Sequence, residues 1–245
     1  MWRLSYTIIR NIFTFPKIIK TMEIMAANSN NALSIDDEEK NYKYVQYVTN
    51  ILKKTGSIST EVFGIENLPQ DGGYMMYPNH QGKYDVYSII SVHNKPCTFV
   101  MDQKKSNSIF IKQIVNILKG KRLDKQNNRQ AMTIINEVAQ EVEQGRKYIL
   151  FPEGSYDNKK KNTLIDFKSG CFKISLKTKT PIVPVVLIDS YKVYNSWAFG
   201  KIKTQVHFLK PIYFSEYKDM KTQEIAKLVK TRIENKIKEL QKEVN

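Results

Sequence analysis

One histidine and one aspartate within residues 78–87 (PNHQGKYDVY) have the types and spacing of a general-base pair. His80 follows the apolar run YMMYP, and Asp85 stands five residues further on. Because imidazole titrates near neutral pH, His80 is suited to remove a proton from a hydroxyl. A carboxylate at Asp85 can accept from one ring nitrogen and leave the other free for that proton. Taken alone, the pair fits an ordinary turn followed by a helix cap equally well, and the spacing by itself favours the turn.

A second polar cluster, FPEGSYDNKK at residues 151–160, also follows an apolar strand, YILFP. Glu153 and Gly154 stand where that strand ends, and free backbone amides beside a glycine can approach a phosphate closely. A plain strand-to-loop turn is the alternative. The segment that follows, residues 159–179, carries seven lysines against the single acid Asp166, a local balance of +6. A phosphorylated ligand or an anionic membrane surface would fit this charge.

Two further segments carry weaker signals. The stretch GKRLDKQNNR groups Arg122, Lys125 and Arg129 around Asp124, an arrangement that any solvated loop could also have. The strand PIVPVVL is interrupted by Pro184, which is unusual inside a central strand because proline lacks the backbone N–H. We therefore expect a bulge at this proline, or a place where the sheet opens for a ligand.

Composition and charge narrow the class of protein. The 245 residues carry 39 Lys and Arg against 24 Asp and Glu, a net charge of +15, which suits an anionic partner or simply a soluble lysine-rich surface. His80, His93 and His207 are too scattered to form a ligand cluster, so no metal site is expected. Cys97 and Cys171 lie far apart, which favours a reducing compartment over a disulfide framework.

The first 25 residues have apolar side chains at helical spacing, interrupted at Pro16, and interspersed basic residues. We expect two short amphipathic helices that lie on a membrane surface, with Trp2, Phe13 and Phe15 at headgroup depth. Helices that dock on the domain are the alternative. Because no window reaches about 18 consecutive apolar residues, no spanning helix is expected. Residues 26–33 (AANSNNAL) are small and polar, which predicts a linker.

The rest of the chain alternates between strand and helix patterns, so we predict one α/β domain over residues 34–245 with a mostly parallel sheet flanked by helices. Residues 1–33 form the predicted membrane-contact segment and linker. Helices are expected at 34–54, 86–93, 108–118, 129–144, 169–178 and near the C-terminus; strands are expected at SISTEVFG, YMMYP, CTFVM, KYILFP, IVPVVLI and KTQVHFL.

The order of the clusters carries more information than any one of them. N-H-x-x-x-x-D, G-…-D-[RK], F-P-E-G-[ST], F-K-x-G and P-I-x-P-V occur in this order over roughly residues 60–190, each near a strand end. This set resembles the glycerolipid acyltransferase family, and within it the 1-acyl-glycerol-3-phosphate acyltransferase type. The family's α/β fold with a hydrophobic acyl groove agrees with the alternation above, and some bacterial members carry an N-terminal two-helix membrane element.

The resemblance implies a role for several residues. His80 would be the catalytic base and Asp85 the acid that orients it. Glu153 and Gly154, followed here by Ser155, would bind the acceptor phosphate, and the motif that contains Pro184 is associated with the acyl donor.

Two departures from the family pattern affect the phosphate site. The third motif usually reads E-G-T-R but here ends Ser155–Tyr156, so the expected arginine is absent. The second motif usually ends D-R, whereas here Lys125 follows the aspartate and offers a point charge instead of a bidentate fork. Phosphate recognition is therefore expected from Lys83, Arg122, Lys125 or the lysines at 159–161.

The resemblance implies transfer of a fatty acyl chain from acyl-CoA or an acyl carrier protein to the free hydroxyl of 1-acyl-glycerol-3-phosphate, giving phosphatidic acid without a cofactor. The implied location is peripheral, on the cytoplasmic face of the cell membrane. Three alternatives remain. The acceptor could be glycerol-3-phosphate or another lysophospholipid, the protein could be a hydrolase, or it could be a non-catalytic basic protein at a membrane surface. We see no motif that supports binding of nucleic acid.

Overall fold

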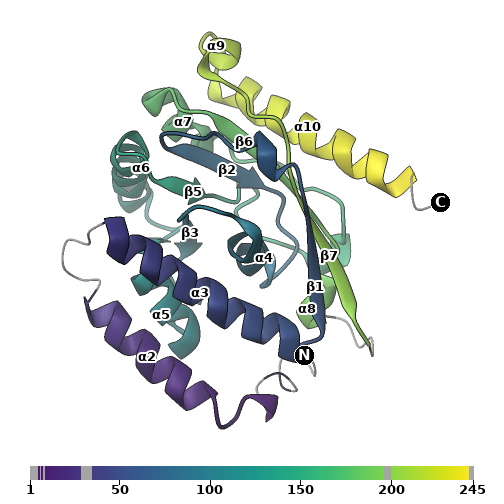
Figure 1. Ribbon diagram of the computed structural model, residues 1–245. Coiled ribbons are helices and arrows are strands. Elements are labelled where there is room, and N and C mark those ends of the chain that lie inside the picture. The colour runs from purple at the N-terminus through teal and green to yellow at the C-terminus, as the bar shows by residue number, and fades with distance from the viewer. Residues whose placement is uncertain (1–4, 6, 8, 29–34, 196–199, 243–245) are drawn as a thin grey trace.

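A seven-stranded sheet lies at the centre of the molecule, in the order β1-β7-β6-β2-β5-β3-β4 (Figure 1). The computed structural model describes residues 5, 7, 9–28, 35–195 and 200–242. Every neighbouring pair of strands is parallel except β6 and β7, which confirms the predicted mostly parallel sheet. The strands are β1 (Ile58–Phe63), β2 (Tyr74–Pro78), β3 (Thr98–Asp102), β4 (Lys121–Leu123), β5 (Lys147–Ile149), β6 (Ile182–Ile188) and β7 (Ile202–Phe208).

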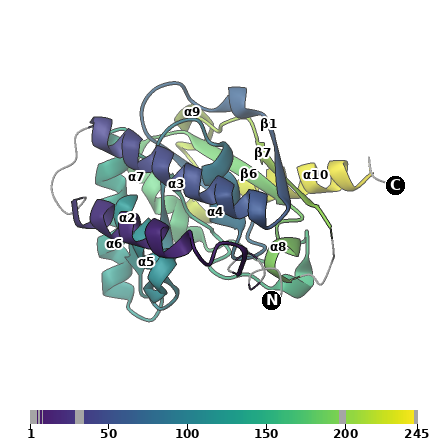
Figure 2. The same ribbon diagram turned by 60° about the horizontal axis from the view of Figure 1, so that its bottom comes forward.

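Helices cover both faces of the sheet, as Figure 1 and Figure 2 show. One face packs against α2 (Phe15–Asn28), α3 (Ile35–Thr55), α4 (Asp85–Val92) and α5 (Ile109–Ile117). The other face packs against α6 (Asn128–Glu143), α7 (Lys173–Thr178), α9 (Phe214–Tyr217) and α10 (Thr222–Lys242). The short α8 (Lys192–Asn195) follows β6. This is the predicted α/β sandwich, with a hydrophobic core on each side of the sheet.

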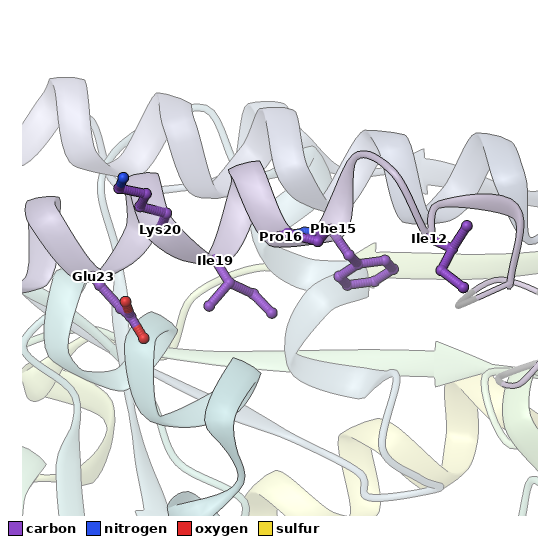
Figure 3. A pocket seen from close by; sticks show the side chains of 6 residues that line it. All are labelled: Ile12, Phe15, Pro16, Ile19, Lys20 and Glu23. Carbon is purple, nitrogen blue, oxygen red and sulfur yellow. The ribbon is translucent and has the colours of Figure 1, made fainter.

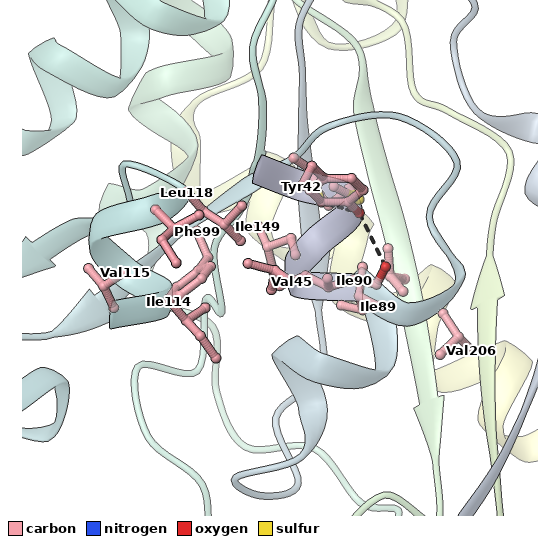
Figure 4. Packing of buried hydrophobic residues seen from close by; sticks show 14 of the residues in the cluster. Tyr42, Val45, Ile89, Ile90, Phe99, Ile114, Val115, Leu118, Ile149 and Val206 are labelled. Carbon is pink, nitrogen blue, oxygen red and sulfur yellow. Dashed lines mark hydrogen bonds between the residues drawn. The ribbon is translucent and has the colours of Figure 1, made fainter. Parts of the chain in front are cut away.

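The central strand β2 shows why the sheet needs both layers. Tyr74 and Met76 pack toward α2–α5, whereas Met75 and Tyr77 pack toward α6, α7 and α10, and all four side chains are fully buried. Strands of a parallel sheet are covered on both faces and therefore read as continuous apolar runs. Figure 4 shows the first of these cores, where Val45 and other side chains of α3, α4 and α5 meet β3 and β5.

The N-terminal region departs in part from the sequence prediction. Pro16 is the second residue of α2 and follows a turn at residues 11–14, so the predicted break at this proline is confirmed. The first of the two expected helices lies largely outside the described residues. The prediction that the linker begins at Ala26 is wrong, because Ala26 is buried within α2, which continues to Asn28. The remainder of the expected linker lies outside the described residues.

Of the bulge or sheet opening expected at Pro184, a bulge is present, but it lies opposite the proline and not in β6, which runs unbroken from Ile182 to Ile188. Val185 pairs with Phe208, and Ile182 pairs with Ile212. Residues 183–184 of β6 therefore face residues 209–211, a segment that is one residue longer. The missing N–H of Pro184 therefore interrupts no regular ladder with β7.

A second departure concerns β4. The sequence predicted no strand at Lys121–Leu123, where a solvated loop was the alternative to a binding cluster, but these residues form a short strand beside β3.

Candidate active site

His80 lies just beyond the end of β2, where the parallel strands β2, β3, β4, β5 and β6 present their carboxyl ends at one edge of the sheet. The preceding residue, Asn79, fixes this exit. Its buried amide side chain donates to the Leu187 carbonyl (3.0 Å) and accepts from the Leu187 N–H (2.7 Å), which ties the end of β2 to β6. The backbone at His80 is therefore held by the sheet and not by a free loop.

His80 and Asp85 form the pair that their spacing suggested. Nδ1 of His80 lies 2.7 Å from Oδ2 of Asp85, and because a carboxylate accepts, the proton sits on Nδ1. The same Oδ2 accepts from the backbone N–H of Gln81 (2.6 Å) and Gly82 (2.9 Å). The Asp85 side chain is completely buried, whereas the His80 side chain remains 17% exposed. Within the part of the chain that the structure describes, Nε2 of His80 has no hydrogen-bond partner, so this nitrogen can accept a proton from a ligand.

The helix-cap interpretation of Asp85 is wrong, because the N-cap residue of α4 is Tyr84 and no side-chain cap hydrogen bond is present there. Asp85 is the first residue of α4, and its carboxylate turns back to accept backbone N–H groups of the preceding loop. The contacts that hold Asp85 in place are therefore the same contacts that aim it at His80.

Glu153 holds the other side of the histidine. Its carboxylate accepts from the backbone N–H of His80 (2.7 Å, Oε1) and from that of Ile165 (3.0 Å, Oε2). Burial raises the pKa of this carboxyl to about 7, against the lowering effect of the two N–H donors. Both oxygens thus bind backbone groups, so the carboxylate joins the end of β2 to the loop that follows β5. The substrate-binding role expected for Glu153 stays a prediction.

We predict that Glu153 makes the stability of the fold depend on pH. A carboxyl whose pKa rises from 4.5 to about 7 on folding stabilises the fold fully below pH 4.5, and this contribution is lost as the pH rises through about 7. The interval corresponds to roughly 3 kcal/mol at about 1.36 kcal/mol per pH unit. Burial lowers the pKa of His93 and of His207 to about 4, and these two groups act in the opposite direction in both proteins. In urea unfolding from pH 4.5 to 8, the stability of the native protein relative to that of Glu153→Gln should therefore fall by this amount. Parallel profiles for the two proteins would contradict the prediction.

Aromatic rings enclose the imidazole of His80. Phe151 stacks on it with ring centroids 4.1 Å apart, and Tyr156 meets it edge-on at 4.7 Å. On the Tyr156 ring lies the ammonium of Lys105, 4.7 Å from the centroid, at the start of the short 3₁₀ helix after β3. The tyrosine that stands where the family pattern has an arginine therefore contacts both the histidine and a lysine.

Lys105 was not selected from the sequence. Its place beside Tyr156 depends on β3 and β5 being neighbours in the sheet, which no local pattern reveals. The run of two lysines at 104–105 after a buried strand was the only available signal.

Gly154 adopts a backbone conformation that disfavours side chains. Its φ is 69°, and a Cβ there would lie 2.9 Å from Cε of Lys168, whose side chain passes over the glycine. Lys168 belongs to the F-K-x-G stretch, so this stretch and the F-P-E-G-[ST] stretch meet here. The next residue, Ser155, is exposed.

The other predicted binding residues are more dispersed along the sheet edge. Nη2 of Arg122 donates to the Asn116 side chain (2.6 Å), and Lys125 pairs with Asp102 at 3.0 Å beside a hollow of about 150 Å³ between the loops after β3 and β4. Both lie beyond β3, on the far side of β5 from His80.

Lys83 and Pro184 occupy opposite situations. Lys83 is exposed in the loop between His80 and Asp85, whereas Pro184 is buried within the sheet, paired with Tyr77.

Enzymes that activate a hydroxyl or a water by general-base catalysis use a histidine whose second ring nitrogen is available to take the proton. The carboxyl edge of a mostly parallel sheet, where this His–Asp pair lies, is the usual position of such a site. Comparison with known proteins narrows this class. The acyltransferase family model matches residues 59–188, more than half of the chain, and the chain belongs to this family. The match includes the His80 loop, the Glu153 loop and β6.

Several curated relatives are named 1-acyl-sn-glycerol-3-phosphate acyltransferase. The chain is 25% identical to the one from Saccharomyces cerevisiae over 193 residues, which cover 78% of this chain and 63% of the relative. It is 28% identical to the one from Escherichia coli K12 over 174 residues, covering 71% and 70%. The chain spans half of a putative relative from Caenorhabditis elegans, at 29% identity.

A solved structure has the same fold. The 1-acyl-sn-glycerophosphate (LPA) acyltransferase PlsC from Thermotoga maritima matches with a TM-score of 0.76 at 20% identity, over 98% of this chain and 96% of that one. The α/β fold with its mostly parallel sheet is thus shared over nearly the whole length of both chains.

Proposed function

We propose that this chain is an O-acyltransferase that moves a fatty acyl chain from an acyl thioester to the free hydroxyl of 1-acyl-sn-glycerol-3-phosphate, giving phosphatidic acid. The observation that carries the proposal is the His80 imidazole: buried Asp85 holds its Nδ1, while its Nε2 has no hydrogen-bond partner among the described residues. The relatives' names and the family match support the substrate class.

The proposed reaction is a direct transfer. Nε2 of His80 takes the proton of the acceptor hydroxyl as its oxygen attacks the thioester carbonyl, and the C–S bond then breaks. The imidazolium returns the proton to the departing thiolate. The Asp85 carboxylate stabilises the imidazolium while it exists, and general-base assistance of this kind contributes roughly 10²–10⁴-fold.

The two cysteines are poor candidates for a covalent acyl intermediate. Burial raises the pKa of the Cys97 thiol to about 12 and that of the Cys171 thiol to about 11, so neither carries an appreciable thiolate fraction near pH 7. Cys97 lies against Tyr42, and Cys171 lies next to Phe172 on the side of α7 and α10. Direct attack by the acceptor hydroxyl is therefore the simpler route.

Lysines are available for the acceptor phosphate near the base. Lys83 is exposed within the His80–Asp85 loop, and Lys105 lies on the Tyr156 ring that touches His80. Each supplies a point charge, which fits a phosphate monoester without demanding the bidentate geometry of an arginine. We therefore favour a phosphate-bearing acceptor over one with a neutral head group.

An acceptor and donor panel tests the proposed function. Purified protein in lipid vesicles would receive lysophosphatidate, glycerol-3-phosphate, lysophosphatidylcholine or monoacylglycerol, each with acyl-CoA or an acyl carrier protein as donor, and mass spectrometry would identify the products. We expect phosphatidic acid from lysophosphatidate as the main product. A preference for an acceptor without a phosphate monoester would contradict the proposed substrate, and free fatty acid alone would indicate a hydrolase.

We propose that residues 1–33 form a membrane-contact segment and a linker, and that residues 34–245 form the acyltransferase domain, peripheral on the cytoplasmic face of the cell membrane. In the described part of the chain, every helix is too short or too polar to cross a bilayer. Apolar side chains nevertheless project from α2 and the turn before it: Ile12 is 57% exposed, Phe13 96% and Ile24 55%.

An apolar hollow of about 530 Å³ runs along α2. It is lined by Ile12, Phe15, Pro16, Ile19, Lys20 and Glu23, which Figure 3 shows along the helix. This is the larger of the two hollows described here, and none of its lining residues belongs to the His80 site. A hollow of this kind on a basic, apolar helix suits lipid chains.

We predict that Phe13→Ala weakens binding to anionic vesicles by about tenfold, because full burial of a phenylalanine side chain contributes roughly 1.5–3 kcal/mol and 1.4 kcal/mol is a factor of ten. Vesicle co-sedimentation measures the effect. Phe63→Ala is the matched control, since Phe63 is a 45% exposed phenylalanine on β1, and it should bind as the native protein does. Equal weakening by both changes, or by neither, would contradict a membrane role for α2 and its preceding turn.

A further inference from the structure

Asp85 has a fourth hydrogen-bond donor that comes from a distant part of the chain. The hydroxyl of Ser190, two residues after β6, lies 2.5 Å from Oδ1 of Asp85. The other carboxylate oxygen, Oδ2, accepts from His80, Gln81 and Gly82. The two oxygens therefore accept from different parts of the chain: Oδ2 accepts from the histidine and its loop, and Oδ1 accepts from the segment after β6.

Burial makes this fourth contact consequential. Asp85 is completely buried and Ser190 is only 2% exposed, so bulk water does not compete for Oδ1. A buried carboxylate oxygen without a donor is costly, and hydrogen bonds to ionised groups are stronger than those between neutral groups. The last side-chain torsion of an aspartate is broad and roughly two-fold, so contacts at both oxygens are needed to fix the carboxylate plane.

Ser190 is itself held in place by Gln81, the neighbour of the histidine. The side-chain oxygen of Gln81 accepts from the Ser190 N–H (2.9 Å), and its amide nitrogen donates to Asn162 (2.7 Å). The Ser190 hydroxyl also lies 2.9 Å from the Gln81 oxygen, but it has a single proton. Because Asp85 is closer and charged, that proton points to Oδ1 of Asp85.

We propose that Ser190 is a positioning residue: by donating to Oδ1 it sets the plane of the Asp85 carboxylate, and thereby the direction from which Oδ2 holds the His80 imidazole. This role rests on the proposed function, because it matters to catalysis only if His80 is the base. Ser190 does not touch the reacting atoms, since it lies on the far side of the carboxylate from the imidazole. It completes a His80–Asp85–Ser190 chain that joins the ends of β2 and β6.

The test combines kinetics with a spectroscopic signal from the histidine itself. Ser190→Ala should lower kcat for acyl transfer about tenfold and leave KM for lysophosphatidate within about twofold, since the change misdirects the base without touching the acceptor. In the proton NMR spectrum the downfield resonance of the His80 Nδ1–H, assigned by its loss in His80→Ala, should shift or broaden. Ser190→Thr keeps a hydroxyl and should restore most of both properties.

Ser175→Ala is the matched control, because it also removes a fully buried hydroxyl, which lies 3.1 Å from that of Tyr77 on the opposite face of the sheet. It should change neither kcat nor the resonance. If Ser190→Ala does not fold, Ser190→Cys, with a similar size and a weaker donor, takes its place. An unchanged kcat or an unchanged resonance would overturn the role of Ser190. A resonance that moves in a protein without transferase activity would instead refute the proposed function alone.

Discussion

Replacing His80 with alanine is expected to abolish acyl transfer while leaving the fold intact. Asp85 holds one ring nitrogen of His80 and leaves the other available to take a proton. Loss of this side chain removes a general base that contributes roughly 10²–10⁴-fold in rate. Structural loss should be small, because the ring is partly exposed and the backbone N–H that binds Glu153 is retained in the variant. Phosphatidic acid formed per minute, and the urea unfolding midpoint, measure the two effects.

His207→Ala is the matched control for this change. His207 is also a histidine near the end of a strand, but it stacks on Phe63 at 4.5 Å in the β1–β7 part of the sheet. Its loss should reduce stability and leave the rate per folded molecule close to native. Near-native activity in His80→Ala would remove the central role of the histidine, whatever the control shows.

Asp85→Asn is expected to lower kcat by about 10²–10⁴-fold with little change in KM. The asparagine oxygen can still accept from the His80, Gln81 and Gly82 nitrogens, so the geometry survives. The charge that stabilises the imidazolium does not survive, and the rate must fall for that reason. Steady-state kinetics with lysophosphatidate in vesicles would separate kcat from KM.

Asp189→Asn offers a control on the same sheet edge. Asp189 pairs with Lys192 and has a φ of 62°, a conformation that asparagine adopts more readily than most residues. Its change removes a neighbouring negative charge without touching the histidine, so kcat should remain within a few-fold of the native value. Equal losses in the two variants would mean that Asp85 acts through the general field of this edge and not through His80.

The sequence was sufficient to predict the helices and strands whose buried side chains leave a regular pattern. The strand YMMYP before His80 is buried on both faces and therefore appears as a continuous apolar run. Helix α6 is buried on one face and therefore shows apolar residues at helical spacing. Both elements could be predicted from these patterns. The short β4 could not, since Lys121 and Arg122 carry charge and no residue of that strand is fully buried. Its pairing depends on β3 being available.

The contacts of the site also fall into two groups: those between residues close in the sequence, which could be predicted, and those between distant residues, which could not. His80 and Asp85 are five residues apart, so their contact is nearly local and a motif can carry it. Ser190 lies 105 residues from Asp85, and Lys105 reaches Tyr156 through the neighbouring strands β3 and β5. Such contacts exist only once the sheet order is set. Glu153 belongs to both groups. Its place in a motif is visible in the sequence, whereas its hydrogen bonds to two backbone N–H groups depend on the fold.

The most direct test is to measure thiol release from acyl-CoA and phosphatidic acid formation together, with purified protein in anionic vesicles, in the presence and absence of lysophosphatidate. If His80 activates the acceptor hydroxyl for direct transfer, thiol and phosphatidic acid should appear in equal amounts, and thiol release should nearly stop when lysophosphatidate is omitted. Thiol release at the same rate without the acceptor, with free fatty acid as the product, would contradict acyl transfer and make water the substrate of the base.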